Sequence, residues 1–152
     1  MNAKTDAPND LLQEHLAHYQ RQCGLAATLD ANRRIIVRAE DAGNVRMPQQ
    51  LGERVHAALR VRSLATPIIV NQRGYWTFLT QSTPPNGQAQ LFDPLFLHRA
   101  KRSVRGCTTT LPGPDDSMRA WLVEPVHISR LPLEAVAEIT LEIAGTTPPV
   151  RI

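Results

Sequence analysis

Residues 67–80, PIIVNQRGYWTFLT, decide the fold class that the sequence predicts. Their first half contains the β-branched run 68–70, which is typical of a strand. Gly74 lies in a short link where a positive φ is needed, and a second strand follows it. Successive side chains of a strand point to opposite faces, so Trp76 and Phe78 share one face. We predict an antiparallel strand pair that turns these two rings into the core.

Helical and strand patterns flank this pair on both sides. Apolar residues at helical spacing predict a first helix that begins at Asn9 or Asp10. Pro48 and Pro132 each suit the first turn of a further helix, and the last helix ends at Gly145. The shorter predicted segments are a hairpin at 25–39, strands at 108–111 and 119–123, and surface loops at 40–44 and 82–90.

The order of these elements predicts an α+β fold. Hairpins imply a mostly antiparallel sheet, and we expect the three helices to pack largely on one of its faces. The chain of 152 residues is long enough for one domain, which we place at 1–145, followed by a flexible tail at 146–152. The sequence has no apolar run long enough for a membrane span, no CxxC motif and no signal peptide, and it therefore predicts a cytoplasmic protein.

Positive charge is concentrated in the middle of the chain. Residues 54–105 contain eight of the 17 basic residues and one of the 14 acidic residues, which gives this segment a net charge of +7. Such a segment is either an anion-binding surface or half of a surface that acidic neighbours neutralise. A short helix from Pro94 to Arg102 would place Arg99 and Arg102 on one side. The residues predicted to bind an anion or nucleic acid are Arg73, Arg99, Lys101, Arg102 and Arg105.

Four apolar residues near this basic cluster form a second candidate surface. An exposed apolar patch of a few hundred Å² would mark a protein-binding site. In that case the basic residues need not converge, because the acidic stripe of the last helix can neutralise them locally. The residues of the predicted patch are Leu91, Phe92, Phe96 and Leu97.

No familiar catalytic or metal-binding motif occurs in the sequence. The phosphate loops GxGxxG and GxxxxGK[ST] and the nucleophile elbow GxSxG are absent. His15 and His18 share a side of the first helix and Cys23 follows, but the carboxylate or third histidine of a usual zinc site is missing. Asp115 and Asp116 are adjacent in a turn, where such residues bond backbone amides. We therefore predict no catalytic residue, no cofactor and no metal.

The chain resembles a family of small uncharacterised proteins from actinomycete genomes in the order of its elements and in its segments PII…RGYWTFLT and TTTLPGPDD…RAWLVEP. These two segments are also similar to the second half of bifunctional primase–polymerase domains, over roughly residues 65–125. Within that range, residues 104–106, 111–114 and 119–121 match that family's motifs. The acidic D-x-D pair and the Ser-x-His nucleotide contact of those polymerases are missing. The resemblance implies a scaffold that has lost the catalytic chemistry.

Three functions remain open on the sequence. The favoured one is a non-catalytic domain with an accessory or regulatory role that binds a protein partner. The alternative is nucleic-acid binding through residues 54–105, and an enzyme whose site is assembled from scattered residues comes third. The first predicts an exposed apolar patch, whereas the second predicts that the basic residues converge on one exposed face.

Overall fold

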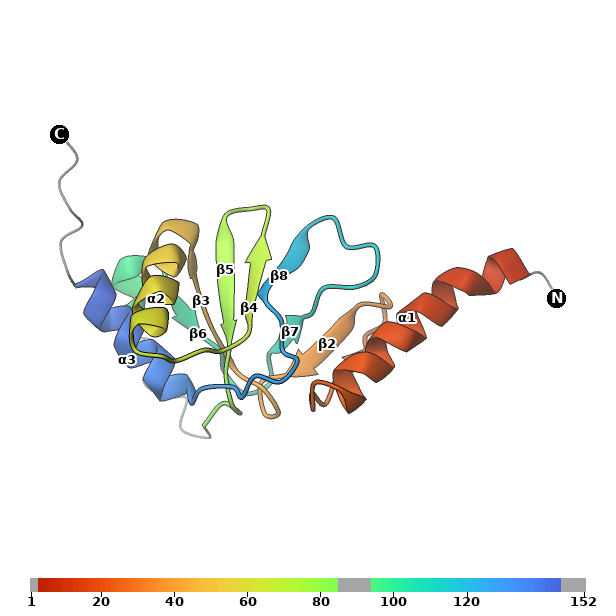
Figure 1. The fold of residues 1–152 in the computed structure, drawn as a ribbon, viewed down its shortest axis with the longest axis horizontal. Coiled ribbons are helices and arrows are strands. Elements are labelled where there is room, and N and C mark those ends of the chain that lie inside the picture. Colours follow the sequence, from red (N-terminus) through yellow and green to blue (C-terminus); the bar gives the residue numbers. More distant parts are fainter. Residues whose placement is uncertain (1–2, 85–93, 146–152) are drawn as a thin grey trace.

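The computed structural model describes residues 3–84 and 94–145 (Figure 1). Its elements follow one another in the order α1 (Ala3–Arg21), β1 (Thr28–Leu29), β2 (Ile35–Arg38), β3 (Asn44–Pro48), α2 (Gln49–Val61), β4 (Ile68–Asn71), β5 (Tyr75–Leu79), the 3-10 helix η2 (Pro94–His98), β6 (Lys101–Arg102), β7 (Thr108–Thr110), β8 (Arg119–Val123) and α3 (Leu133–Ala144). This content confirms the predicted α+β class. No helix within the two described ranges is both long and apolar enough to cross a membrane. The predicted tail at 146–152 and most of the predicted loop at 82–90 lie outside the described residues.

The strands form two antiparallel sheets rather than one. The larger sheet has the order β6-β3-β5-β4-β8, and the smaller one has the order β1-β2-β7. The hairpin of β4 and β5 lies in the middle of the larger sheet, where Ile68 pairs with Phe78 and Val70 pairs with Trp76. The predicted strand pair is therefore confirmed, and the other strands of this sheet add to its two sides.

The first of two cores lies between the larger sheet and the helices α2 and α3, which cover one of its faces (Figure 1). Trp76 is 9% exposed and Phe78 is fully buried in this core, which confirms the prediction for both rings. On α2 the buried stripe consists of Leu51, Val55 and Leu59, at the spacing that places residues on one side of a helix. α3 contributes an apolar stripe of its own.

The second core is covered by α1, which lies at the other end of the molecule from α2 and α3 (Figure 1). Tyr19 of α1 is buried there beside Ile35 of the smaller sheet. Ile69 and Leu79 of the larger sheet also belong to this core, because they alternate with the residues that face α2 and α3. The expectation of helices on one face therefore holds for α2 and α3, whereas α1 and the smaller sheet cover the opposite side.

The predicted helix from Pro94 to Arg102 is wrong in its second half. The 3-10 helix η2 ends at His98, and Arg99 adopts a left-handed backbone with a φ of 61°. Lys101 and Arg102 then form β6, which pairs with β3 and so satisfies backbone groups that a longer helix would have satisfied. Arg99 and Arg102 consequently do not share one side of a helix.

α1 begins at Ala3, ahead of the predicted start at Asn9 or Asp10. The Asn9 side chain has a tertiary partner instead of a capping role, because its amide oxygen accepts a hydrogen bond from Arg33 in the turn between β1 and β2. The predicted loop at 40–44 is also one residue too long, since Asn44 is the first residue of β3.

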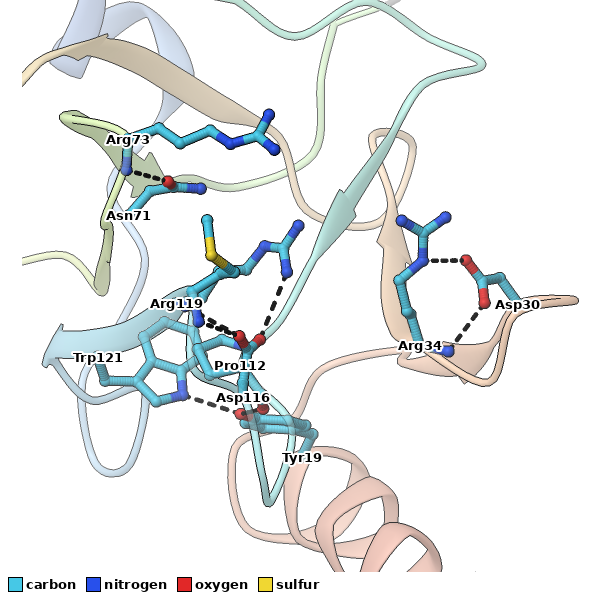
Figure 2. Close-up of polar contacts among 10 residues, drawn as sticks. Tyr19, Asp30, Arg34, Asn71, Arg73, Pro112, Asp116, Arg119 and Trp121 are labelled. Carbon is cyan, nitrogen blue, oxygen red and sulfur yellow. Dashed lines mark hydrogen bonds and ion pairs between the residues drawn. The ribbon is translucent and has the colours of Figure 1, made fainter.

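The hydroxyl group of Tyr19 connects α1 to other segments of the chain through two hydrogen bonds (Figure 2). This group donates a hydrogen bond to the carbonyl oxygen of Pro112 at 2.5 Å and accepts one from Nε1 of Trp121 at 2.9 Å. The side chain is 2% exposed. Burial raises the pKa of Tyr19 from its ordinary value of 10.0 to about 12, so the folded protein favours the protonated hydroxyl.

Replacing Tyr19 with phenylalanine is expected to lower the free energy of unfolding by about 1–3 kcal/mol, because the Trp121 N–H and the Pro112 carbonyl lose their partner. The unfolded chain releases the Tyr19 proton near pH 10 and the folded protein near pH 12, so the wild type loses this stability as the pH rises between those values. The gap between wild type and Tyr19→Phe should therefore narrow above pH 10. Urea denaturation of both proteins at neutral and alkaline pH measures this difference in the free energy of unfolding. A difference that is absent, or that grows as the pH rises, would contradict the role given to the Tyr19 hydroxyl.

Candidate functional site

A groove of about 710 Å³ is lined by strands of both sheets and by the segments next to them. Six basic side chains line this groove, and no acidic side chain of the described residues does. We call it the basic groove. Its cationic residues are Arg34, Arg46, Arg73, Lys101, Arg102 and Arg119. Its neutral hydrogen-bonding residues are Asn44, Asn71, Thr77, Ser103, Thr108, Thr109 and Thr110.

Strand alternation explains why polar residues reach the groove from a buried sheet. Val45 and Met47 of β3 are fully buried in the first core, and Arg46 between them is exposed. Thr77 lies in the same way between the buried Trp76 and Phe78. The face of the larger sheet opposite α2 and α3 therefore supplies one wall of the basic groove.

The strand register places two like charges side by side. Arg46 of β3 is paired with Lys101 of β6 on one side and with Thr77 of β5 on the other. Like charges directly opposite one another are unfavourable in a sheet. A bound anion would relieve this repulsion, so the register itself favours an anionic ligand.

Three of the six cations are held by carboxylates. Arg34 lies 3.0 Å from Asp30, Arg102 lies 2.6 Å from Glu134 and Arg119 lies 3.4 Å from Asp116, measured between nitrogen and oxygen. These distances are short enough for ion pairs, whose geometry fixes where each guanidinium points. Figure 2 shows Arg34 and Arg119 approaching from different elements, each with its carboxylate partner.

The pKa values of the two carboxylates drawn in Figure 2, Asp30 and Asp116, are both lowered. The backbone N–H of Arg34 and its guanidinium lower the pKa of Asp30. Burial alone would raise the pKa of Asp116, but the N–H groups of Met118 and Arg119, at 2.8 and 3.0 Å, together with the Arg119 guanidinium, hold it below the usual value. At neutral pH both carboxylates are therefore ionised, and Asp30 and Asp116 can hold Arg34 and Arg119 as ion pairs.

The other three cations have no carboxylate partner among the described residues. The Arg46 guanidinium lies over the ring of Tyr75, with its Cζ 4.7 Å from the ring centroid. The backbone N–H of Arg73 donates to the side chain of Asn71 at 2.7 Å, which fixes the β4–β5 turn and leaves the guanidinium directed away from that contact (Figure 2). Within residues 3–84 and 94–145, Arg46, Arg73 and Lys101 thus give the groove three positive charges that no carboxylate pairs with.

The structure brings together three of the five predicted anion-binding residues. Arg73, Lys101 and Arg102 line the basic groove. Arg99 lines a smaller hollow beside it, and Arg105 is exposed in the turn between β6 and β7, outside both linings. Sequence reasoning missed the other three cations of the groove. The sequence could have indicated one of these, Arg46. An arginine that alternates with apolar residues in a strand faces away from the core.

The predicted apolar patch is described only in part. Phe96 is 48% exposed and Leu97 is 83% exposed, while Leu91 and Phe92 lie outside the described residues. Phe96 also lines the basic groove. Phe96 is therefore part of the charged site, whereas Leu97 does not line it.

His15 and His18 lie in a different hollow, of about 300 Å³, against Tyr19 and Trp121. The Cys23 sulfur is 3.6 Å from Nε2 of His18, and burial raises the pKa of that thiol. In the described part of the chain no three His, Cys, Asp or Glu side chains come together in a way that could hold a metal ion.

Comparisons with protein-family models, with curated proteins and with solved structures found no match to this chain. The similarity to primase–polymerase domains therefore stays a prediction from the sequence. The chemistry of the candidate site rests on its own geometry.

Proposed function

We propose that this protein binds nucleic acid in the basic groove. The observation that carries the proposal is the convergence of six cations, from the larger sheet, its β4–β5 turn and the residue before β2, on one groove that no described acidic side chain lines. Phosphate contacts by lysine and arginine supply most of the sequence-independent affinity of proteins for nucleic acids. The proposed role is one of binding, because cations and neutral donors line the groove and none of its described lining residues is a carboxylate that could act as a base or hold a metal.

A chain of phosphates fits this groove better than a single small anion does. The cations come from well-separated elements, with Arg34 beside β2 of the smaller sheet and Lys101 on the edge strand of the larger one. A single phosphate would contact only part of this set, whereas a backbone with regularly spaced charges can contact cations along the whole groove. The threonine and asparagine side chains between the cations are donors of the kind that contact phosphate and sugar oxygens.

A protein partner remains the second candidate. The exposure of two adjacent apolar side chains favours it, because Phe96 is 48% exposed and Leu97 is 83% exposed and contiguous apolar surface marks protein-binding sites. We place it second because one of the two, Phe96, lines the basic groove. Of the five basic residues predicted from the sequence, Arg73, Lys101 and Arg102 line the basic groove, which supports nucleic-acid binding, whereas Arg99 and Arg105 do not line it.

The double variant Arg73→Ala/Lys101→Ala tests the proposal. It removes two of the uncompensated charges, and we expect the affinity for a labelled oligonucleotide of about 12 nucleotides to fall roughly tenfold at low salt. Fluorescence anisotropy gives the Kd. The matched control is Arg21→Ala/Arg60→Ala, which removes the same charge from exposed residues of α1 and α2 outside the groove. Equal losses in both double variants would mean that binding follows net charge, and the groove assignment would be wrong.

A further inference from the structure

One end of the basic groove is aromatic. A second hollow, of about 370 Å³, lies beside the groove and is lined by Arg46, Tyr75, Phe96, Arg99 and Lys101. Arg46, Phe96 and Lys101 line both spaces, so the two lie side by side. All five lining residues are either aromatic or cationic. We call this hollow the aromatic end.

The backbone around Phe96 is held in place by a buried neighbour and by hydrogen bonds. Leu95, its neighbour in η2, is fully buried in the first core. The N–H of Arg99 donates to the carbonyl of Phe96 at 3.1 Å, and the N–H of Ala100 donates to that of Leu95 at 3.0 Å. The backbone is thus fixed on both sides of Phe96, and its ring is exposed on a rigid support.

Tyr75 supplies the second ring from the sheet. It precedes the buried Trp76 in β5, so alternation turns it to the groove face together with Thr77. The Arg46 guanidinium stacked over its ring adds a flat cationic surface next to the phenol. Flat rings and guanidinium planes are the surfaces on which proteins stack unpaired bases.

We propose that the aromatic end holds an unpaired nucleobase, and that the ligand of the basic groove is single-stranded nucleic acid rather than a duplex. This inference rests on the proposed function and adds the strand state of the ligand. The cations alone suit either form, because both present phosphates. Only a single strand offers free base faces to Phe96, since the bases of a duplex stack on one another.

The test compares three single strands of equal charge that differ in their bases or sugars, together with a duplex whose two strands carry about twice that charge. Four labelled ligands of about 12 units are used: a single strand of DNA, the RNA of the same sequence, an abasic DNA strand and the DNA duplex. The wild type should bind the two strands that carry bases about 5- to 100-fold more tightly than the abasic strand, by anisotropy at low salt. Phe96→Ala should remove most of that advantage and leave the affinity for the abasic strand unchanged. Phe96→Trp should keep it.

Leu97→Ala is the matched control, because Leu97 is the adjacent and more exposed apolar residue. It should bind all four ligands as the wild type does. If abasic and base-carrying strands bind equally, or if the duplex binds most tightly, this inference is wrong while phosphate binding in the groove stands. If no ligand binds at low salt, the proposed function fails and this inference fails with it.

Discussion

Phe78→Ala will lower the free energy of unfolding by about 3–5 kcal/mol, the range for removing a large buried aromatic side chain. Phe78 is fully buried at the centre of the larger sheet, where it pairs with Val45 of β3 and with Ile68 of β4. α2 and α3 close the space above it, so rigid elements surround the cavity that the variant leaves. A domain of ordinary stability has about 5–15 kcal/mol in total, and this loss threatens the fold itself.

Urea denaturation followed by far-ultraviolet circular dichroism measures this effect. Phe78→Leu retains part of the volume and should lose less, so it gives a measurable value if the alanine variant does not fold. Leu122→Ala is the control, because Leu122 is 44% exposed on β8 and should change the free energy of unfolding by about 0.5 kcal/mol or less. A loss below about 1 kcal/mol for Phe78→Ala would show that this hairpin is not the centre of the core.

The hairpin of β4 and β5 was predictable because its signals are local. A β-branched run, a glycine in the link and alternating aromatic residues all lie within residues 67–80. Gly74 has a φ of 89°, as the predicted link requires. α2 and α3 were predictable for a similar reason, since a proline precedes each helix and an apolar stripe runs along it.

β6 was not predictable because its cause is distant in sequence. This strand has two residues, both basic, and it exists because the edge of β3 accepts it. The left-handed backbone at Arg99 turns the chain out of η2 toward that edge. No pattern in residues 94–102 signals a pairing with residues 45 and 46. The division into two sheets has the same origin, because β2 pairs with β7 across a long stretch of chain.

The candidate site was predictable only to the extent that its residues cluster in sequence. Arg73, Lys101 and Arg102 come from the basic middle segment, and net charge was enough to select them. Arg34, Arg46 and Arg119 lie in segments with a net negative charge. The net charge of a segment therefore does not identify them as anion-binding residues. Their convergence depends on sheet pairing, which brings β3 between β5 and β6 and β8 beside β4.

The second large effect is expected from salt. Each phosphate that a cation neutralises releases condensed counterions, so the logarithm of the Kd rises linearly with the logarithm of the salt concentration. Arg46, Arg73 and Lys101 have no carboxylate partner in the described part of the chain and can exchange counterions for phosphates, whereas the other three cations already have carboxylates. For a single strand, three such contacts give a slope of about 2. A tenfold rise in salt should therefore weaken binding by about 100-fold.

The salt dependence of the wild-type Kd for a single-stranded oligonucleotide tests the central claim most directly, because it counts the phosphates that the basic groove neutralises. Anisotropy titrations across roughly 30 to 300 mM sodium chloride should give a log–log slope of about 2, which rises toward 4 if the carboxylate-held arginines also take part. In Arg73→Ala/Lys101→Ala the slope should fall by about 1.4, two contacts' worth. A slope near zero, an equal slope in that variant, or no binding at the lowest salt would contradict the account.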